Sequence, residues 1–185
     1  MTKQLVLTMY VGVPGSGKST YLDNLEKNVM KNDLYYVASS DRFLEAWAEM
    51  EGLTYQEVFK DRIGEATSRM YDEVKEAIQN RLDIHWDQTN LTVKGRKKKL
   101  DLFPNHYYKQ AIFFNNPANL YDRLDKRERE TGKHIPDHVI QQMIDSAVVP
   151  TFEEGFEKII IVDDMDGQCV YYKEYKELLL LKRGK

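Results

Sequence analysis

Short apolar runs recur along the chain, and longer stretches between them carry apolar residues at every third or fourth position. Apolar runs bounded by polar or turn-forming residues predict β-strands, here at residues 4–11, 34–38, 83–86, 107–114 and 158–162. Strands that alternate with helices form parallel βαβ units. The pattern therefore predicts an α/β fold of three layers, with a central parallel sheet of about five strands.

The stretches between these runs predict helices. The longest covers about residues 55–82, and shorter patterns cover residues 18–29 and 117–131. Thr92 can cap a further helix, and Pro136 suits the first turn of another. The tail, residues 165–185, joins a β-prone start to a run of leucines and predicts no definite element. No repeat or linker divides the chain, so we expect one domain over residues 1–185.

Composition narrows the class of protein. The 185 residues are 42% hydrophobic, and 27 basic against 30 acidic residues give a net charge of −3. A uniformly basic surface for nucleic acid is therefore excluded, although a local basic patch is not. One cysteine cannot form an intramolecular disulfide. The apolar start at Leu5 has no signal-peptide cleavage pattern and no run is long enough to span a membrane, so we expect a cytoplasmic protein.

A phosphate-binding loop lies between the first strand and the first helix. Residues 12–19 match the pattern G-x-x-x-x-G-K-[ST], in which glycines bring backbone N–H groups close to phosphate oxygens. Lys18 is expected to reach the β- and γ-phosphates of ATP, and the Ser19 hydroxyl is expected to bind Mg²⁺. The residues predicted to bind the nucleotide are Gly12, Gly15, Ser16, Gly17, Lys18, Ser19 and Thr20.

This loop predicts triphosphate binding but is shared by kinases, GTPases, motor ATPases and binding modules. The chain has no Asn-Lys-x-Asp guanine signature, which argues against a GTPase. Residues 159–164 resemble a Walker B strand of a motor ATPase, but they come very late in the chain. A strand-end acid after an apolar run is also common, so this pattern adds little.

Three further segments carry a resemblance to a known family. They are residues 39–43 (SSDRF), residues 87–91 (DQTNL) and residues 123–127 (RLDKR), the last followed by Ile135 and Pro136. With the phosphate loop they cover about residues 4–150 and resemble the kinase domain of the phage polynucleotide 5′-kinase family. The DQTN segment is also similar to the ATPase-like segment of heterogeneous nuclear ribonucleoprotein U. Zeta toxins share the phosphate loop and the acid after the second strand.

The resemblance implies roles for individual residues. Asp41 would be the general base that accepts the proton of the attacking hydroxyl. Asp87 would contact Mg²⁺ or the substrate, with Thr89 and Asn90 beside the substrate. Each also has a plainer interpretation, as a first-turn acid, a strand-end polar residue or turn and cap residues. The chain departs from the family at Leu44, where the polynucleotide kinases carry an arginine that contacts the substrate phosphate.

Two arginines of the helical pattern at residues 117–131 lie four positions apart. Arg123 and Arg127 would repel each other on an isolated helix, and an anion between them would reverse that cost. We therefore expect residues 117–149 to form a helical lid in which both arginines stabilise the transferring phosphoryl group. The alternative is an ordinary solvated helix, because Glu130 can reach Arg127.

A basic run follows the DQTN segment. Residues 94–99 (KGRKKK) are answered only by Asp101, and they could line a groove for a nucleic-acid backbone. Arg96 matches an arginine of the resembling kinases and is the residue of the run we expect to bind substrate. The alternative interpretation is a solubilising helix face.

The leading hypothesis is an ATP- and Mg²⁺-dependent kinase that phosphorylates the 5′-hydroxyl end of DNA or RNA. Its expected catalytic residues are Lys18, Asp41, Arg123 and Arg127. Its expected metal ligands are Ser19 and Asp87, and its substrate side would comprise Asp87, Thr89, Asn90 and Arg96. Two alternatives stay open. One is a kinase for a hydroxyl on a modified base, a nucleoside or another small metabolite, and the other is a nucleotide-binding module without kinase activity.

Overall fold

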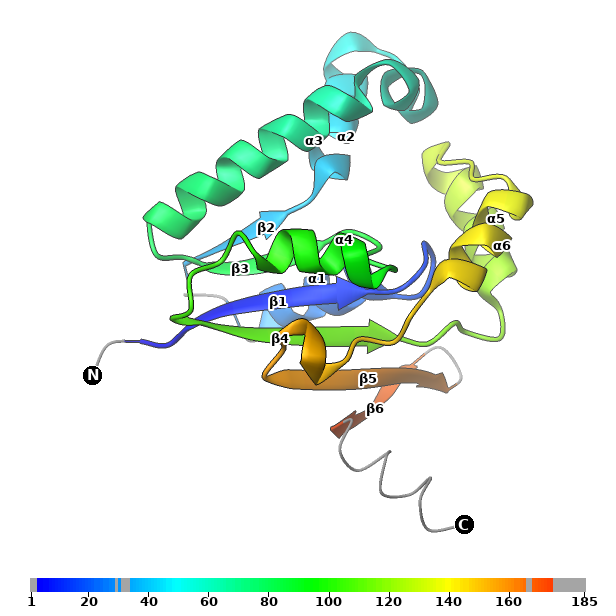
Figure 1. The fold of residues 1–185 in the computed structure, drawn as a ribbon. Helices are drawn as coiled ribbons and strands as arrows, with labels where there is room; N and C mark the ends of the chain where they lie inside the picture. The colour runs from blue at the N-terminus through cyan, green and yellow to red at the C-terminus, as the bar shows by residue number, and fades with distance from the viewer. Residues whose placement is uncertain (1–2, 29, 31–33, 166–167, 175–185) are drawn as a thin grey trace, which may run out of the picture.

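Six strands form one sheet in the computed structural model, which describes residues 3–28, 30, 34–165 and 168–174 (Figure 1). The strands are β1 (Leu5–Val11), β2 (Tyr35–Ala38), β3 (Asp83–Asp87), β4 (Tyr107–Phe114), β5 (Lys158–Met165) and β6 (Gln168–Glu174). Their order is β2-β3-β1-β4-β5-β6, with every neighbouring pair parallel except β5 and β6, which are antiparallel. The predicted parallel sheet of about five strands is confirmed, and β6 adds an antiparallel edge.

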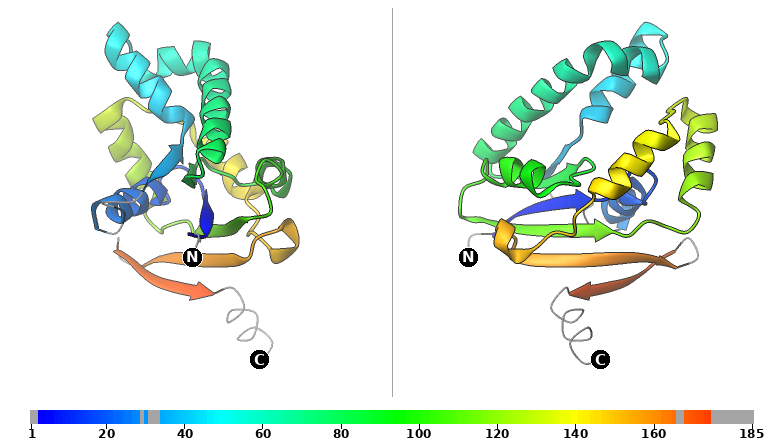
Figure 2. Two further views of the ribbon diagram at one scale, coloured as in Figure 1. Left: turned by 90° about the vertical axis from the view of Figure 1, so that its left-hand side faces the viewer. Right: turned by 45° about the vertical axis from the view of Figure 1, so that its right-hand side comes forward.

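Helices cover both faces of the sheet (Figures 1 and 2). The helices are α1 (Lys18–Asn28), α2 (Ser40–Glu51), α3 (Tyr55–Gln79), α4 (Val93–Leu100), α5 (Leu120–Thr131) and α6 (Asp137–Ser146). α1 covers one face, while α3 and α4 cover the other. α5 and α6 stand beyond one end of the strands, and the outer part of the α2–α3 pair lies opposite them.

Alternating side chains of the central strands supply the two cores. On β1, Leu7 and Met9 pack with Met70 and Val74 of α3, whereas Tyr10 packs with Leu22 of α1. All six are buried. Because successive strand residues point to opposite faces, a strand buried on both sides reads as one continuous apolar run. This is why the apolar runs predicted the first four strands within one residue, while β5 runs three residues beyond its predicted end.

Two elements differ from the sequence-based expectation. α2 begins directly after β2, with Ser39 as its N-cap, and ends at Gly52, whose φ of 66° suits a residue without a Cβ. Residues 39–43 carry a motif in the sequence, but no helix is predicted there. β6 occupies the start of the tail, while residues 175–185, with their leucine run, lie outside the described residues. None of the described helices combines the length and apolar character that a membrane span requires.

The strand order sets the position of the site. The chain moves from β1 outward to β2, returns through β3, and then crosses to β4 on the other side of β1. In open α/β sheets, ligands bind beyond the carboxyl ends of the strands at such a reversal. The loop after β1, the start of α2, the end of β3 and the start of α5 all lie at this edge.

Candidate active site

A cavity of about 1510 Å³ opens at the carboxyl edge of the sheet. Its walls are formed by the loop after β1, α1, α2, the end of β3, part of α3 and the α5–α6 segment. The predicted site residues among its lining are Gly15, Ser16, Gly17, Lys18, Ser19, Thr20, Asp41, Asp87, Thr89, Arg123 and Arg127. The structure therefore brings four segments that are far apart in sequence to one place.

The phosphate loop is shaped by close contacts at its glycines. A Cβ on Gly12 would lie 2.6 Å from Ser16 Oγ, closer than atoms can approach without a shift. Gly15 has a φ of +80°, and a Cβ there would lie 3.1 Å from methyl carbons of Leu120 and Leu124 at the start of α5. α5 is thus packed directly against the turn of the loop. Gly12 N–H also donates to the carbonyl of Thr89, 3.0 Å away, which ties the loop to the end of β3.

Lys18 is buried within this loop. Its Nζ donates to the carbonyl oxygens of Gly12, at 2.9 Å, and Val13, at 2.8 Å. Burial lowers the pKa of the ammonium from 10.5 to about 8, and the nearby Asp87 carboxylate opposes part of that effect. The two carbonyl oxygens offer the buried ammonium only partial negative charge. Phosphate oxygens would offer it full negative charge.

Ser19 and Asp87 form the second part of the loop site. Ser19 Oγ donates to Asp87 Oδ2 at 3.3 Å, and burial raises the pKa of Asp87 while Lys18 opposes that rise. A hydroxyl beside a carboxylate is an oxygen pair of the kind that Mg²⁺ takes when phosphates and water complete its shell. Ser16 Oγ is the buried side-chain oxygen left without a hydrogen-bond partner among the described residues. These residues therefore fit a nucleoside triphosphate with Mg²⁺.

Asp41 lies across the cavity, in the first turn of α2. Its Oδ1 accepts a hydrogen bond from Tyr55 Oη at 3.0 Å. Its Oδ2 lies 3.4 Å from Lys133 Nζ and 3.7 Å from an Arg127 guanidinium nitrogen. Burial, with the nearby Asp41 carboxylate, raises the pKa of Tyr55, so the phenol stays a donor at neutral pH. Both carboxylate oxygens are therefore oriented by groups from other elements.

Arg123 and Arg127 of α5 both line the cavity. A Cβ on Gly17 would lie 3.9 Å from Arg123 Nη1, so this guanidinium sits beside the phosphate loop. Arg127, one turn further along α5, reaches Asp41 instead. The two cations thus span the space between the nucleotide side and the Asp41 side.

The structure corrects the prediction that Arg96 binds substrate. Arg96 has no exposed surface, and it forms a two-pronged ion pair with Glu154, with both N–O distances 2.7 Å. It also donates to the carbonyl oxygens of Asn90, Leu91 and Val148 at 2.9–3.0 Å. Arg96 therefore holds the loop after β3 against the segment after α6 and cannot reach a substrate.

Asn90 is likewise misassigned as a substrate-binding residue. Its side chain is buried, donates to the carbonyl of Tyr10 at 2.7 Å and accepts from Lys99 Nζ. Its φ of 50° lies in the left-handed region, which asparagine tolerates better than most residues. Asn90 shapes the turn that presents Asp87 and Thr89. Of the three residues of this segment that were expected at the substrate, Asp87 and Thr89 line the cavity and Asn90 does not.

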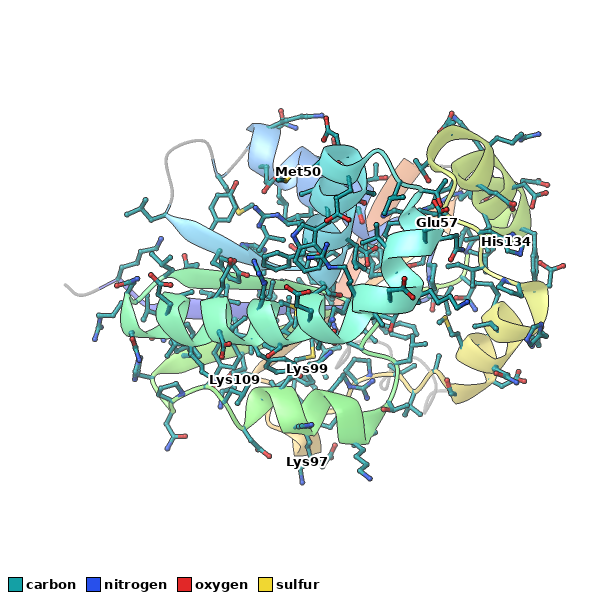
Figure 3. All side chains as sticks on the ribbon, turned by 90° about the horizontal axis from the view of Figure 1, so that it is seen from above. Met50, Glu57, Lys97, Lys99, Lys109 and His134 are labelled. Atoms are coloured by element: carbon teal, nitrogen blue, oxygen red, sulfur yellow. The ribbon has the colours of Figure 1, made fainter. Side chains whose placement is uncertain are left out.

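The basic run does not form one surface. Figure 3 shows Lys97 pointing away from the body of the molecule, whereas Lys99 lies on the side of α4 that faces α3. Lys98 is also exposed. Lys99 donates to Gln88 at 2.8 Å and lies 5.2 Å from the centre of the Trp86 ring, and burial lowers its pKa to about 8. None of the residues 94–99 lines the cavity described above.

Two residues of the cavity lining, Lys133 and Glu45, and their neighbour Tyr55 contact the Asp41 side chain or its partners but were not predicted as site residues. Lys133 and Glu45 form an ion pair next to Asp41, and Tyr55 orients Asp41 itself. Glu45 lies four positions after Asp41 on α2, a spacing that would have placed both carboxylates on one helix face had the helix been recognised. For Lys133 the sequence offers only its position after Gly132 at the end of α5. Leu44 is fully buried and faces away from the cavity.

Comparison with known proteins identifies the fold. A family described as an AAA domain matches residues 7–150. Among solved structures, the PezAT toxin–antitoxin system of Streptococcus pneumoniae matches at 21% identity and a TM-score of 0.68, covering 97% of this chain and 77% of that chain. A candidate kinase from Chloroflexus aurantiacus matches at 15% identity and a TM-score of 0.67, covering 100% of this chain and 97% of that one.

A component of the Pnkp1/Rnl/Hen1 RNA repair complex is also similar. It matches at 24% identity and a TM-score of 0.61, over 79% of this chain and 45% of that one. This chain thus spans less than half of the matched component. At such identities the likeness shows the fold, a P-loop kinase-like sheet with helices on both faces.

Proposed function

Because the chain belongs to the AAA domain family of P-loop proteins, we propose that it is an ATP-dependent kinase that transfers the γ-phosphoryl group to a hydroxyl. One observation carries the proposal. The cavity that contains the phosphate loop also contains Asp41, a carboxylate in hydrogen-bonding surroundings, with Arg127 at 3.7 Å. A binding module needs the loop alone. A kinase also needs a base and a cation where charge develops in transfer.

The transfer follows from the positions of these groups. The loop amides and Lys18 would hold the phosphates of ATP, with Arg123 beside the loop. The acceptor oxygen, placed near Asp41, gives its proton to that carboxylate and forms a bond to the γ-phosphorus, while the bond from the γ-phosphorus to the β,γ-bridging oxygen breaks and ADP leaves. Arg127, between Asp41 and the nucleotide side, would stabilise the phosphoryl oxygens during transfer.

Ser19 and Asp87 are the residues that would hold Mg²⁺ in this reaction. The ion would neutralise part of the phosphate charge when bound. The Ser19–Asp87 pair lies on the nucleotide side of the cavity, so its expected effect is on nucleotide binding and on the leaving ADP.

The first candidate for the acceptor is the 5′-hydroxyl end of DNA or RNA. The resemblance of residues 4–150 to phage polynucleotide 5′-kinases supports it, as does a structural neighbour that belongs to an RNA repair complex. Phe59 and Ile63 line the Asp41 side of the cavity and offer an apolar surface to a base or sugar.

A second candidate acceptor is a small, neutral hydroxyl compound, such as a nucleoside or a base-borne hydroxymethyl group. The charges of the cavity favour it. In the described part of the chain, the lining has six carboxylates and six cations: Asp23, Glu26, Asp41, Glu45, Asp87 and Glu130 against Lys18, Arg42, Arg123, Lys126, Arg127 and Lys133. The lining therefore has no excess of positive charge, and Arg127 and Lys133 already contact Asp41, so the cavity offers a polynucleotide phosphate next to the reacting hydroxyl no net attraction.

Transfer of label from γ-labelled ATP tests both levels of the proposal. The acceptor panel would contain a 5′-hydroxyl oligonucleotide, the same oligonucleotide with a 5′-phosphate, and single nucleosides. Label on the 5′-hydroxyl oligonucleotide alone supports the first candidate, whereas label on nucleosides supports the second. The absence of label on every acceptor of this panel, with ATP still bound, would favour the nucleotide-binding module over both polynucleotide and nucleoside kinases.

Asp41→Asn tests the base within the same assay. The change keeps the shape and removes the basicity, so transfer should fall about 10²- to 10⁴-fold while the affinity for a non-hydrolysable ATP analogue changes little. Asp61→Asn is the matched control, because Asp61 is an exposed carboxylate of α3 outside the cavity. Transfer at the native rate by Asp41→Asn would reduce Asp41 to a helix-start residue.

A further inference from the structure

Lys133 is a nearly buried lysine that links the two sides of the cavity. It follows Gly132, whose left-handed backbone ends α5 and turns the chain back toward the cavity, and its side chain is only 8% exposed. Its Nζ lies 3.4 Å from Asp41 Oδ2, forms an ion pair with Glu45 and lies 4.4 Å from the centre of the Tyr55 ring. One side chain from the α5–α6 connection therefore contacts both α2 and α3.

A second contact joins the same segments. Gln56, near the start of α3, donates from its side chain to the backbone carbonyl of His134. Figure 3, which labels Glu57 and His134, shows the start of α3 facing the α5–α6 connection. The start of α3 and the α5–α6 connection, which these two contacts join, both lie on the side away from the sheet (Figure 1).

We propose that Lys133 is a positioning residue of the transfer reaction, which holds Asp41 and Arg127 in their working arrangement by joining the α5–α6 segment to α2 and α3. The inference rests on the proposed kinase function. Arg127 lies on α5 and Asp41 on α2, and the two contacts between these segments set the distance between those helices. A base and a cation that act on one transferring group must keep that distance, because small misplacements cost large factors in rate.

The charge of Lys133 matters as well as its position. Asp41 and Glu45 lie four residues apart on α2, where like charges repel. The ammonium between them offsets that repulsion and keeps Asp41 turned toward Tyr55 and Arg127. Burying a lysine ammonium costs free energy unless carboxylates compensate its charge. An uncharged side chain would fill this space at a lower cost in free energy. The ammonium is therefore the part to remove in a test.

Lys133→Met tests the proposal through kinetics, because methionine keeps most of the volume and loses the charge. We expect kcat to fall about 10- to 100-fold, as for a misplaced reacting group. We expect the affinity for a non-hydrolysable ATP analogue to stay within about twofold, because Lys133 does not touch the phosphate loop. The matched control is Lys75→Met, which removes an exposed lysine of α3 that pairs only with Asp72 in the described contacts.

A compensating change separates positioning from simple packing. In Lys133→Met, Glu45 is left as an uncompensated carboxylate beside Asp41. Adding Glu45→Gln should therefore recover part of the lost kcat. If Lys133 only fills space, the second change recovers nothing, and that result overturns the proposal. A kcat of Lys133→Met within about twofold of the native value also overturns it, as does a loss of ATP affinity equal to the loss of kcat.

A distance measurement tests the bridge without any transfer. Spin labels at Lys60→Cys on α3 and Asp125→Cys on α5 lie on exposed positions, with the single cysteine, Cys169, replaced by serine. With the ATP analogue bound, we expect a narrower and shorter distance distribution with Lys133 than with Lys133→Met. Equal distributions would overturn the proposal. If the native protein phosphorylates no acceptor, the kinase proposal fails while this measurement still reports whether Lys133 joins the two sides.

Discussion

His85 provides a quantitative test of the packing beneath the phosphate loop. It lies in the middle of β3, is 8% exposed, and its Nδ1 pairs with Tyr10 Oη at 2.8 Å. Its ring stacks on Tyr10 at 6.0 Å and meets Tyr35 edge-on at 5.6 Å. Burial lowers the pKa of His85 from 6.5 to about 4, with a smaller opposing effect from Asp83. The folded protein therefore keeps this imidazole neutral at pH values where the unfolded chain protonates it.

The sign and size of the effect follow from this difference. Between pH 6.5 and pH 4 the unfolded state binds more protons at His85 than the folded state, so the free energy of unfolding falls as the pH falls. Between pH 8 and pH 5 the loss due to this group is about 2 kcal/mol, at about 1.36 kcal/mol per pH unit below the unfolded pKa. Further loss ends near the folded pKa.

Urea unfolding at pH 8 and pH 5 measures this loss against a variant. His85→Gln offers Tyr10 a polar partner and has no titration in this range. Because all other ionisable groups are shared, the native protein should lose about 2 kcal/mol more than the variant on going to pH 5. Equal losses in the two proteins would refute the reasoning, since they would mean that His85 protonates equally in both states.

Three further predictions concern the site and its support. Glu154→Gln leaves the buried Arg96 without a carboxylate, so the free energy of unfolding should fall by about 3–5 kcal/mol in urea melts. Gly15→Ala forces a side chain into a left-handed position against α5, so affinity for a fluorescent ATP analogue should fall, while thermal melting checks that the fold persists. Changing Lys97 and Lys98 together to Ala should leave oligonucleotide KM and its salt dependence unaltered, because both are exposed and outside the cavity; a raised KM would restore the basic run as a binding surface.

Local signals in the sequence were sufficient for the strands and the phosphate loop. Strands buried on both faces show as apolar runs, and the glycines and Lys18 of the loop act through neighbouring backbone atoms. Thr92 likewise caps α4 as predicted, accepting from the backbone N–H of Gly95 at 3.2 Å. In these cases the partner lies within a few residues, so spacing alone carries the information.

The errors arose where the partner is distant in sequence. Arg96 resembled a substrate-binding arginine because Glu154, which neutralises it, lies 58 residues away. Lys133 was not predicted as a site residue because its carboxylate partners, Glu45 and Asp41 of α2, lie 88 and 92 residues earlier in the chain. A single sequence shows which charges have no local partner, but only the fold shows whether the missing partner is a ligand or another part of the chain.

The packing of α5 on Gly15 has a mechanical consequence. Leu120 and Leu124 pin the first turn of the helix to the phosphate loop, and Thr131 at its other end lies about 10 Å further along the axis, at about 1.5 Å per residue. The helix can therefore pivot about its contact with the loop. A rotation of about 20° would move its far end by about 3–4 Å over that length. That is enough to separate Lys133 from Asp41, while Arg123, near the pivot, stays beside Gly17. If the chain is the kinase proposed above, the acceptor side would then open while the nucleotide remains held, and we predict that the phosphorylated product leaves before ADP.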